Sequence, residues 1–481
     1  MFSNIFSDDH LLIRRRFQNI AIPEMKCCIL YFDGMVNAER INENIIRPIL
    51  KYQETQAFTS NHLLEELKYK VIQANNLKTS EDIQEIVSAV IYGDTIFLLE
   101  GYSEAIIIDT KGWQTRAITE PDSNKVVRGP REGFTESILI NTSLLRRKIV
   151  NSNLKFIHKE IGERTHTKTS ICYIEGLALD GVLQELEQRL DRINIDGIID
   201  SGYIQELIKD AKYSPYPTVG TSERPDVIAA RLLEGRVALF VDGSPFVLTV
   251  PYILAEVAQT NEDYYNNFIF GSINRLLRTV SAILSFSIPA VFLALVTFHQ
   301  EMLPTQLLLS ISASRQGVPL PTSLSLFMML LIFDILREAG TRMPTAIGQT
   351  VTIVGTLILG QAAVEARLVS APVIIITALS GILTLMNHEL IAATIVVRFF
   401  LLMATSFLGI YGYFLGIIMV LIHLMNIRSF GVPYMMNISR IANHNYQDTW
   451  IRAPWWSMIL RPKIIAAKNL KRQSQRNNRG N

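Results

Sequence analysis

Cysteine is scarce in this sequence, and its spacing matches no metal site. The 481 residues include three cysteines, Cys27, Cys28 and Cys172. This usage fits a protein of a reducing compartment, and packing is the commoner role of adjacent cysteines in a strand. The sequence therefore predicts no metal ion.

An excess of charge of one sign is also missing, since the formal net charge is +2. This balance excludes the bulk basic footprint of a nucleic-acid-binding protein. The sequence contains no P-loop, nucleophile elbow, HExxH motif or Cys/His cluster. We therefore expect a protein that is not an enzyme, with no catalytic residues, no cofactor and no nucleic acid.

The first residues, MFSNIFSDDHLLIRRRF, lack the pattern of a secretory signal. Asp8 and Asp9 stand early, and neither an apolar core nor a small-residue cleavage site follows. We expect the N-terminal part to remain in the cytosol.

Apolar residues are distributed unevenly. Charged and apolar residues alternate up to about Asn274, the stretch from Leu276 to Met425 is mostly apolar, and eight basic residues without an acid follow from Arg452 onward. This pattern predicts an α/β soluble region, an α-helical multi-pass membrane domain and a basic cytosolic tail. We expect an N-terminal extension at 1–25, a first α/β subdomain at 26–150 and a second at 151–274. The membrane domain is expected at 275–426 and the tail at 427–481.

The soluble region contains an internal resemblance. Residues 81–110 and 224–251 both fit the order helix, turn, strand, turn, strand without gaps. Three pairs of glycines share an offset of 142 positions (176 − 34, 235 − 93 and 243 − 101): Gly34 and Gly176, Gly93 and Gly235, Gly101 and Gly243. Equal offsets predict two tandem related subdomains, with chance similarity as the alternative.

Five stretches approach or exceed the roughly 20 apolar residues that a spanning helix needs: 279–298, 318–336, 346–365, 368–386 and 399–425. The stretch 303–313 is too short to cross and is predicted to be re-entrant or interfacial. Arg275, Arg278 and the basic tail predict that both ends of the domain are cytosolic. If both ends are cytosolic, the number of crossings must be even, but five stretches are an odd number. Either one stretch does not cross, or 389–425 forms two passes broken near Gly409 and Gly412. The number of crossings, between four and six, is left open by the sequence.

Charged residues within the apolar region need partners, because an unpaired charge at mid-bilayer costs about 2.5 kcal/mol or more. Asp334 and Arg337 are three positions apart, and Glu338 and Arg342 are four apart, so each pair shares a helix face. Ion pairs at a helix end are the simpler interpretation, and a coupling element to the soluble part is the alternative. Arg398 needs an acid, a headgroup or water. Its possible acidic partners are Glu365 and Glu389.

The stretch 346–366 is unusually rich in small and polar residues for a membrane helix. One helical face has small residues that favour close packing in lipid: Gly348, Thr352, Thr356, Gly360 and Ala363. The opposite face is polar at both ends and apolar in the middle: Thr350, Val354, Leu357, Gln361 and Glu365. We expect protein or water around this helix, either as a pore lining whose apolar rings gate by dewetting or as a helix buried in a monomeric bundle.

Seven segments between about residues 27 and 436 resemble the A subunit of the spore germinant receptor family of endospore-forming bacteria. They are TEPDSNKVVRGPREGF, DSGYIQELIKDAKYSPYPTVGTSERPD, GRVALFVDGSPFVLTVP, FHQEMLPTQLLLSISASRQGVPLP, REAGTRMPTAIGQTV, GQAAVEARLVSAP and SFGVPYM.

The resemblance implies a nutrient receptor subunit in the inner membrane of dormant spores. It implies assembly with a transporter-like B subunit, to which nutrient recognition is generally assigned, and a lipoprotein C subunit. It also implies a homo-oligomer, a pentamer, that forms a ligand-gated channel for monovalent cations. In that case residues 346–366 lie at the axis and Leu357 forms the narrowest ring. The alternatives are a non-conducting scaffold and a secondary transporter with a substrate site near 303–321.

Overall fold

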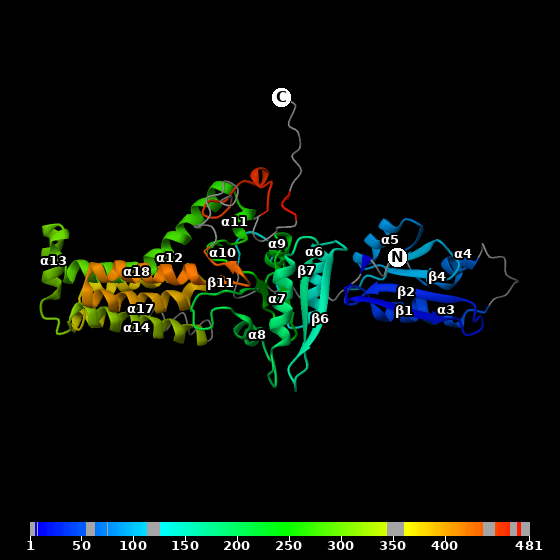
Figure 1. Ribbon diagram of the computed structural model, residues 1–481, viewed down its shortest axis with the longest axis horizontal. Coiled ribbons are helices and arrows are strands. Elements are labelled where there is room, and N and C mark those ends of the chain that lie inside the picture. Colours follow the sequence, from blue (N-terminus) through cyan, green and yellow to red (C-terminus); the bar gives the residue numbers. More distant parts are fainter. Residues whose placement is uncertain are drawn as a thin grey trace, which may run out of the picture. The chain divides into compact units, whose positions relative to one another are not determined.

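The computed structural model describes residues 5–6, 8–53, 63–74, 76–112, 126–343, 360–435, 448–461 and 469–472 (Figure 1). The chain divides into two compact units. Unit 1 comprises residues 1–209, 219–251 and 458–481, and unit 2 comprises residues 210–218 and 252–457. Residues 252–274, which the sequence analysis groups with the second subdomain, thus lie with the helical unit.

Unit 1 contains two antiparallel five-stranded sheets. The first has the order β1 (Leu12–Gln18), β2 (Lys26–Phe32), β4 (Thr95–Leu99), β5 (Ala105–Ile108) and β3 (Leu77–Ser80). The second has the order β6 (Leu154–Ile161), β7 (Thr167–Ile174), β9 (Val237–Val241), β10 (Val247–Val250) and β8 (Gly220–Ser222). Counted from its own first strand, each sheet has the order 1-2-4-5-3. The first strand lies within residues 1–25, so this part of the expected N-terminal extension is a sheet edge.

The turns of the two sheets repeat as well. The six glycines paired by the offset of 142 all have positive φ, between 76° and 96°. A residue with a Cβ rarely adopts this conformation, and glycine adopts it without penalty. The repeated glycines therefore mark equivalent turns in two related α/β subdomains.

Helices cover both sheets of unit 1. Those associated with the first subdomain are α2 (Ala38–Arg40), η1 (Ile41–Ile46), α3 (Arg47–Lys51), α4 (Leu63–Glu66), η2 (Leu67–Val71) and α5 (Ile83–Ile91). Those that follow are α6 (Ile138–Lys148), α7 (Asp180–Asp191), α8 (Ser201–Ile208) and α9 (Pro225–Leu233).

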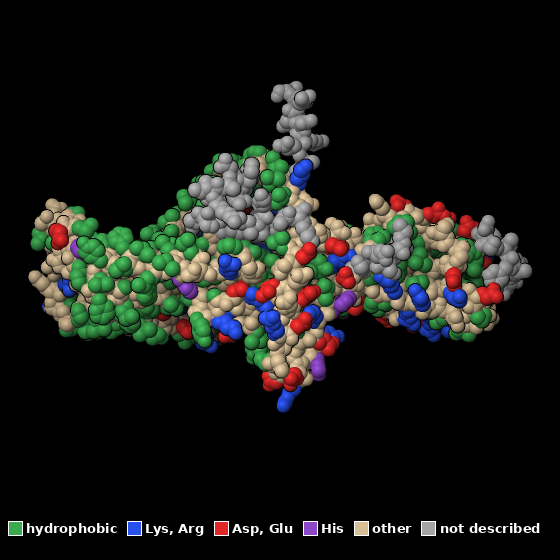
Figure 2. Space-filling model, in the orientation of Figure 1, with side chains coloured by type: hydrophobic (Ala, Val, Ile, Leu, Met, Phe, Trp, Pro, Cys, Tyr) green, Lys and Arg blue, Asp and Glu red, His purple; other side chains and the backbone are tan. Residues whose placement is uncertain are grey.

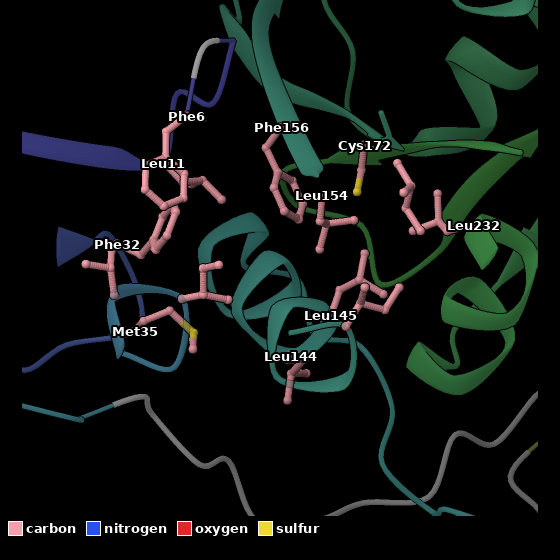
Figure 3. Close-up of a cluster of buried hydrophobic side chains, with 14 of the residues drawn as sticks. Phe6, Leu11, Phe32, Met35, Leu144, Leu145, Leu154, Phe156, Cys172 and Leu232 are labelled. Atoms are coloured by element: carbon pink, nitrogen blue, oxygen red, sulfur yellow. The ribbon is translucent and has the colours of Figure 1, made fainter. Parts of the chain in front are cut away.

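A single apolar cluster joins the two subdomains (Figure 3). It contains Phe32 from β2, Leu145 from α6, Phe156 from β6 and Cys172 from β7. Burial raises the pKa of the Cys172 thiol well above its usual range, so this side chain packs as a neutral group.

Unit 2 is helical. Its long helices are α12 (Phe268–Thr297), α14 (Thr322–Arg342), α16 (Ala371–Leu385), α17 (Ile391–Leu408) and α18 (Ile410–Asn426). Its shorter elements are α10 (Leu254–Val257), α11 (Glu262–Tyr265), η3 (Gln300–Met302), α13 (Thr305–Arg315), η4 (His388–Leu390), β11 (Arg428–Ser429), β12 (Val432–Pro433) and η5 (Trp455–Ser457).

Candidate functional site in the helical bundle

The bundle of unit 2 has an apolar surface. Within the described residues, α12 and the stretch His388–Leu408 are long and apolar enough to cross a bilayer, and α16 and α18 are apolar but shorter. Figure 2 shows hydrophobic side chains gathered over these helices. Large side chains such as Ile375 and Phe407 are exposed on α16 and α17. Such a surface suits lipid, which is as apolar as these side chains.

The long apolar stretch 389–425 is broken into two helices at Gly409. This residue has φ 61° and ψ −140°, a conformation essentially restricted to glycine. A Cβ on Gly409 would also lie 2.9 Å from Phe298 at the end of α12. The stretch therefore forms two helices, which is the arrangement that one of the two alternatives from the sequence requires.

A fully buried guanidinium lies in the middle of the bundle. The Nη2 atom of Arg398 on α17 is 2.5 Å from the carboxylate of Asp334 on α14, and its Nη1 atom donates to the hydroxyl of Ser380 on α16 at 3.2 Å. Ser380 in turn donates to the carbonyl of Ser285 on α12 at 2.6 Å. The second oxygen of Asp334 is 3.0 Å from Arg337. This polar network therefore joins four helices.

The partner of Arg398 differs from the two acids considered from the sequence. Glu389 instead accepts a hydrogen bond from the Tyr252 hydroxyl, and Glu365 is exposed. Asp334 was assigned only to a local pair with Arg337. The distance of 64 positions between Asp334 and Arg398 leaves no periodic signal that would reveal this contact.

The remaining predicted charge pair lies on the surface. Glu338 and Arg342 are 2.7 Å apart, and their side chains are 57% and 80% exposed. A pair this exposed contributes about 0–1 kcal/mol because water screens both charges. Of the two charge pairs predicted on α14, the one that contains Asp334 is sheltered from solvent.

Helices α14 and α16 run parallel. Leu326, near the start of α14, lies in one apolar cluster with Val373, near the start of α16. Seven residues further along α14, the Phe333 ring packs over Gly381 of α16. Residues 343–370 therefore connect the end of α14 with the start of α16, which lie at opposite ends of this helix pair.

All ten predicted pore and packing residues fall within this connection. Six of them lie outside the described residues: Gly348, Thr350, Thr352, Val354, Thr356 and Leu357. Among the others, Gly360 and Ala363 are half-buried, whereas Gln361 and Glu365 are exposed. Ala363 packs against the apolar cluster that contains Val373.

A second polar cluster fixes the beginning of α12. The Arg275 guanidinium is completely buried and lies 2.8 Å from Asp448 and 3.3 Å from Asp263. Arg278 also pairs with Asp263, and the Tyr264 hydroxyl donates to Asp448 at 2.5 Å. The sequence analysis used the two arginines as orientation signals and did not predict that both pair with Asp263 or that Arg275 also pairs with Asp448.

Unit 1 has a comparable buried pair between its subdomains. Arg146 on α6 lies 2.7 Å from Asp9, with both side chains at most 1% exposed. The Arg146 guanidinium also lies 3.8 Å from the ring centre of Phe32 and 5.0 Å from that of Phe156, so it contacts both sheets. Asp9 and Arg146 are 137 positions apart, and no sequence motif connects them.

The fold and these contacts define a two-part protein: an α/β unit with two related subdomains, and an apolar helical unit with charges buried inside it. A model of the family described as Bacillus/Clostridium GerA spore germination protein matches residues 1–464. The chain therefore belongs to the GerA spore germination protein family.

Curated relatives cover most of this chain. It is 39% identical over 449 residues to spore germination protein KA of Bacillus subtilis (strain 168), covering 93% of this chain and 82% of that protein. It is 34% identical over 448 residues to spore germination protein GerLA of Bacillus cereus, covering 92% and 90%. It is also similar to a protein of Bacillus subtilis (strain 168) described as uncharacterized membrane protein YfkQ, at 38% identity over 93% of this chain and 87% of that protein.

Among solved structures, this chain is similar to the crystal structure of the N-terminal domain of the A subunit of the Bacillus megaterium spore germinant receptor GerK3. The sequence identity is 29% and the TM-score 0.41, with 51% of this chain and 90% of that chain covered.

Proposed function

We propose that this chain is the A subunit of a nutrient germinant receptor and that copies of it form a nutrient-gated channel for monovalent cations. It acts in the spore inner membrane, as a homo-oligomer that we take to be a pentamer, and channel opening starts germination. The family of spore germination proteins and the apolar surface of the bundle support this proposal.

The parallel arrangement of α14 and α16 is the observation that carries the channel proposal. In this proposal the chain crosses the membrane once more within residues 343–370, the region rich in small and polar residues, and the five long helices bring the number of crossings to six. An even number places the N-terminal unit and the C-terminal tail on the same side of the membrane, and the basic residues predict that this side is the cytosol.

In this proposal the stretch 346–366 lines the pore. Thr350, Val354, Leu357, Gln361 and Glu365 face the axis, with Leu357 as the narrowest ring. Apolar rings of this kind close a pore by excluding water from it. The small face of the same stretch packs on neighbouring helices.

The A subunit acts together with a transporter-like B subunit, which recognises the nutrient, and a lipoprotein C subunit. The A subunit of the GerK3 receptor is named as one subunit of a germinant receptor, which supports a complex of this kind. In this proposal unit 1, whose two subdomains share one apolar core, passes strain between subunits.

Spores that carry Leu357→Ala in this chain test the proposal. Removing the narrowest apolar ring admits water and ions, so these spores should release monovalent cations and lose dormancy without nutrient. Cation release is measured in the medium over time. Normal ion retention with wild-type levels of the variant protein would contradict the gate.

A further inference from the structure

Helix α13 (Thr305–Arg315) is barely covered by its own chain. It lies at one end of the bundle in Figure 1, and Ile311 is its one buried residue. Leu307 and Leu309 are 48% and 64% exposed. An isolated helix of this length is marginal in water, so another surface has to cover it.

The pattern of side chains on α13 argues against lipid as that surface. Eleven residues are too few to span a bilayer. Leu307 and Leu309 point in directions about 200° apart at 100° per residue, so α13 lacks the single apolar face of a helix that lies on a membrane.

Two of the three serines of α13, Ser310 and Ser314, already form hydrogen bonds within the helix. The hydroxyl of Ser310 donates to the carbonyl of Gln306 at 2.9 Å, and that of Ser314 donates to the carbonyl of Ile311 at 2.7 Å. A helix whose hydroxyls bond to its own backbone can be buried without a desolvation penalty for them. The helix is therefore suited to a protein interface.

Charges of opposite sign mark the two ends of this element. Glu301 precedes α13, Arg315 ends it, and Arg367 lies against Gly317, two residues beyond Arg315. The two ends of the helix are about 15 Å apart at 1.5 Å per residue. Within the part of the chain that the structure describes, none of these three side chains forms an ion pair.

We propose that α13 docks against a second copy of this chain, with Glu301 of one copy paired to Arg315 and Arg367 of the next. The acid and the bases belong to one sequence and lie at opposite ends of one element, so an identical molecule supplies the complement of each end. A contact between two different patches is head-to-tail, and it forms a ring where the rotation between successive copies closes. The inference rests on the proposed homo-oligomer and assigns its interface.

Cross-linking of the full chain tests the interface. We expect the double variant Glu301→Cys/Arg315→Cys, treated with a mild oxidant in detergent, to give a ladder of covalent species beyond the dimer. Each single variant and the wild type, which retains its three native cysteines, should give no ladder. Absence of a ladder from correctly folded double variant would overturn the proposal, as would a dimer formed by either single variant.

Charge reversal provides a second measurement. Glu301→Arg alone, or Arg315→Glu with Arg367→Glu, should weaken the oligomer about tenfold or more, because like charges then face each other. Combining all three reversals should restore it. Glu338→Arg, which alters an exposed pair elsewhere on the bundle, is the control and should leave the oligomer unchanged. Failure of the combined variant to restore assembly would contradict the pairing.

Failure of the interface and failure of the channel are distinguishable. A ladder from protein that never conducts ions would support the docking of α13 and contradict the channel. Conductance from an oligomer that gives no ladder would support the channel and overturn this interface.

Discussion

Each unit contains a buried arginine opposed by a single aspartate. Arg146 and Arg398 are at most 1% exposed, and their carboxylate partners, Asp9 and Asp334, are sheltered as well. A guanidinium remains charged under all ordinary conditions. Removing the aspartate would leave an uncompensated charge in an apolar environment, which costs far more than the intact pair contributes.

We expect Asp334→Asn to destabilise the helical unit by about 3–5 kcal/mol, because it leaves Arg398 buried without a counter-charge. Thermal unfolding of the full chain in detergent measures this loss. Glu338→Gln, at the exposed pair on the same helix, is the matched control and should cost less than about 1 kcal/mol. Equal effects of the two variants would show that the Arg398 contact does not hold the bundle together.

Unit 1 should lose stability as the pH falls. Burial, and then the nearby charge of His10, lower the pKa of His158 below its usual range. The unfolded chain, with a histidine pKa of about 6.5, therefore binds the proton more readily, and unfolding becomes easier below that pH. The loss begins near pH 6.5 and levels off below the pKa of the folded state.

His158→Gln should reduce the decrease in stability between pH 8 and pH 5. Denaturant unfolding of the full chain at several pH values measures it. His166→Asn, at an exposed turn residue with φ 43°, serves as the control, since asparagine tolerates this conformation. A pH dependence that is unchanged in His158→Gln would contradict the assignment.

The sequence identified some of these residues and missed others for a definable reason. Arg398 stood out because a lone charge in an apolar run needs a partner, and Asp334 stood out because Arg337 follows at helical spacing. Neither signal connects Arg398 with Asp334. Asp9 and Arg146 gave no signal, because their contact depends on how the two subdomains pack.

At the scale of elements, glycine determines where chain direction changes. Gly409→Ala should destabilise the bundle by about 1–3 kcal/mol, since alanine is strained at φ 61° and its Cβ would press on Phe298. Thermal unfolding in detergent measures the effect. Gly181→Ala in α7 is the control, because nothing lies within 4 Å of the added Cβ. Comparable changes in both variants would contradict a special role for Gly409.

The sequence predicted elements best where a local rule applies. The offset of 142 identified equivalent turns, because the same backbone conformation requires glycine in both subdomains. The break at Gly409 was one of two alternatives, since glycine alone does not end a membrane helix. The parallel course of α14 and α16 was not predicted, because it follows from contacts between Phe333 and Gly381 that lie far apart in sequence.

At the scale of the whole molecule, the two units have features that suit different roles. Unit 1 offers two subdomains fused through one core, which suits the transmission of a conformational change. Unit 2 offers an apolar surface with buried charges, which suits a membrane. The proposed channel adds to this plan the stretch 346–366, whose polar face is unnecessary in a lipid-embedded anchor.

The central claim is that this stretch lines a pore closed by Leu357. The most direct measurement is the conductance of the purified oligomer in planar bilayers, recorded for the wild type, for Leu357→Ala and for Leu379→Ala. Leu379 is exposed on α16, so its variant controls for the loss of a leucine outside the proposed gate. We expect a closed wild type, a closed Leu379→Ala variant and a leaky Leu357→Ala variant. No conductance in any of the three, with assembly intact, would contradict the channel and favour a scaffold.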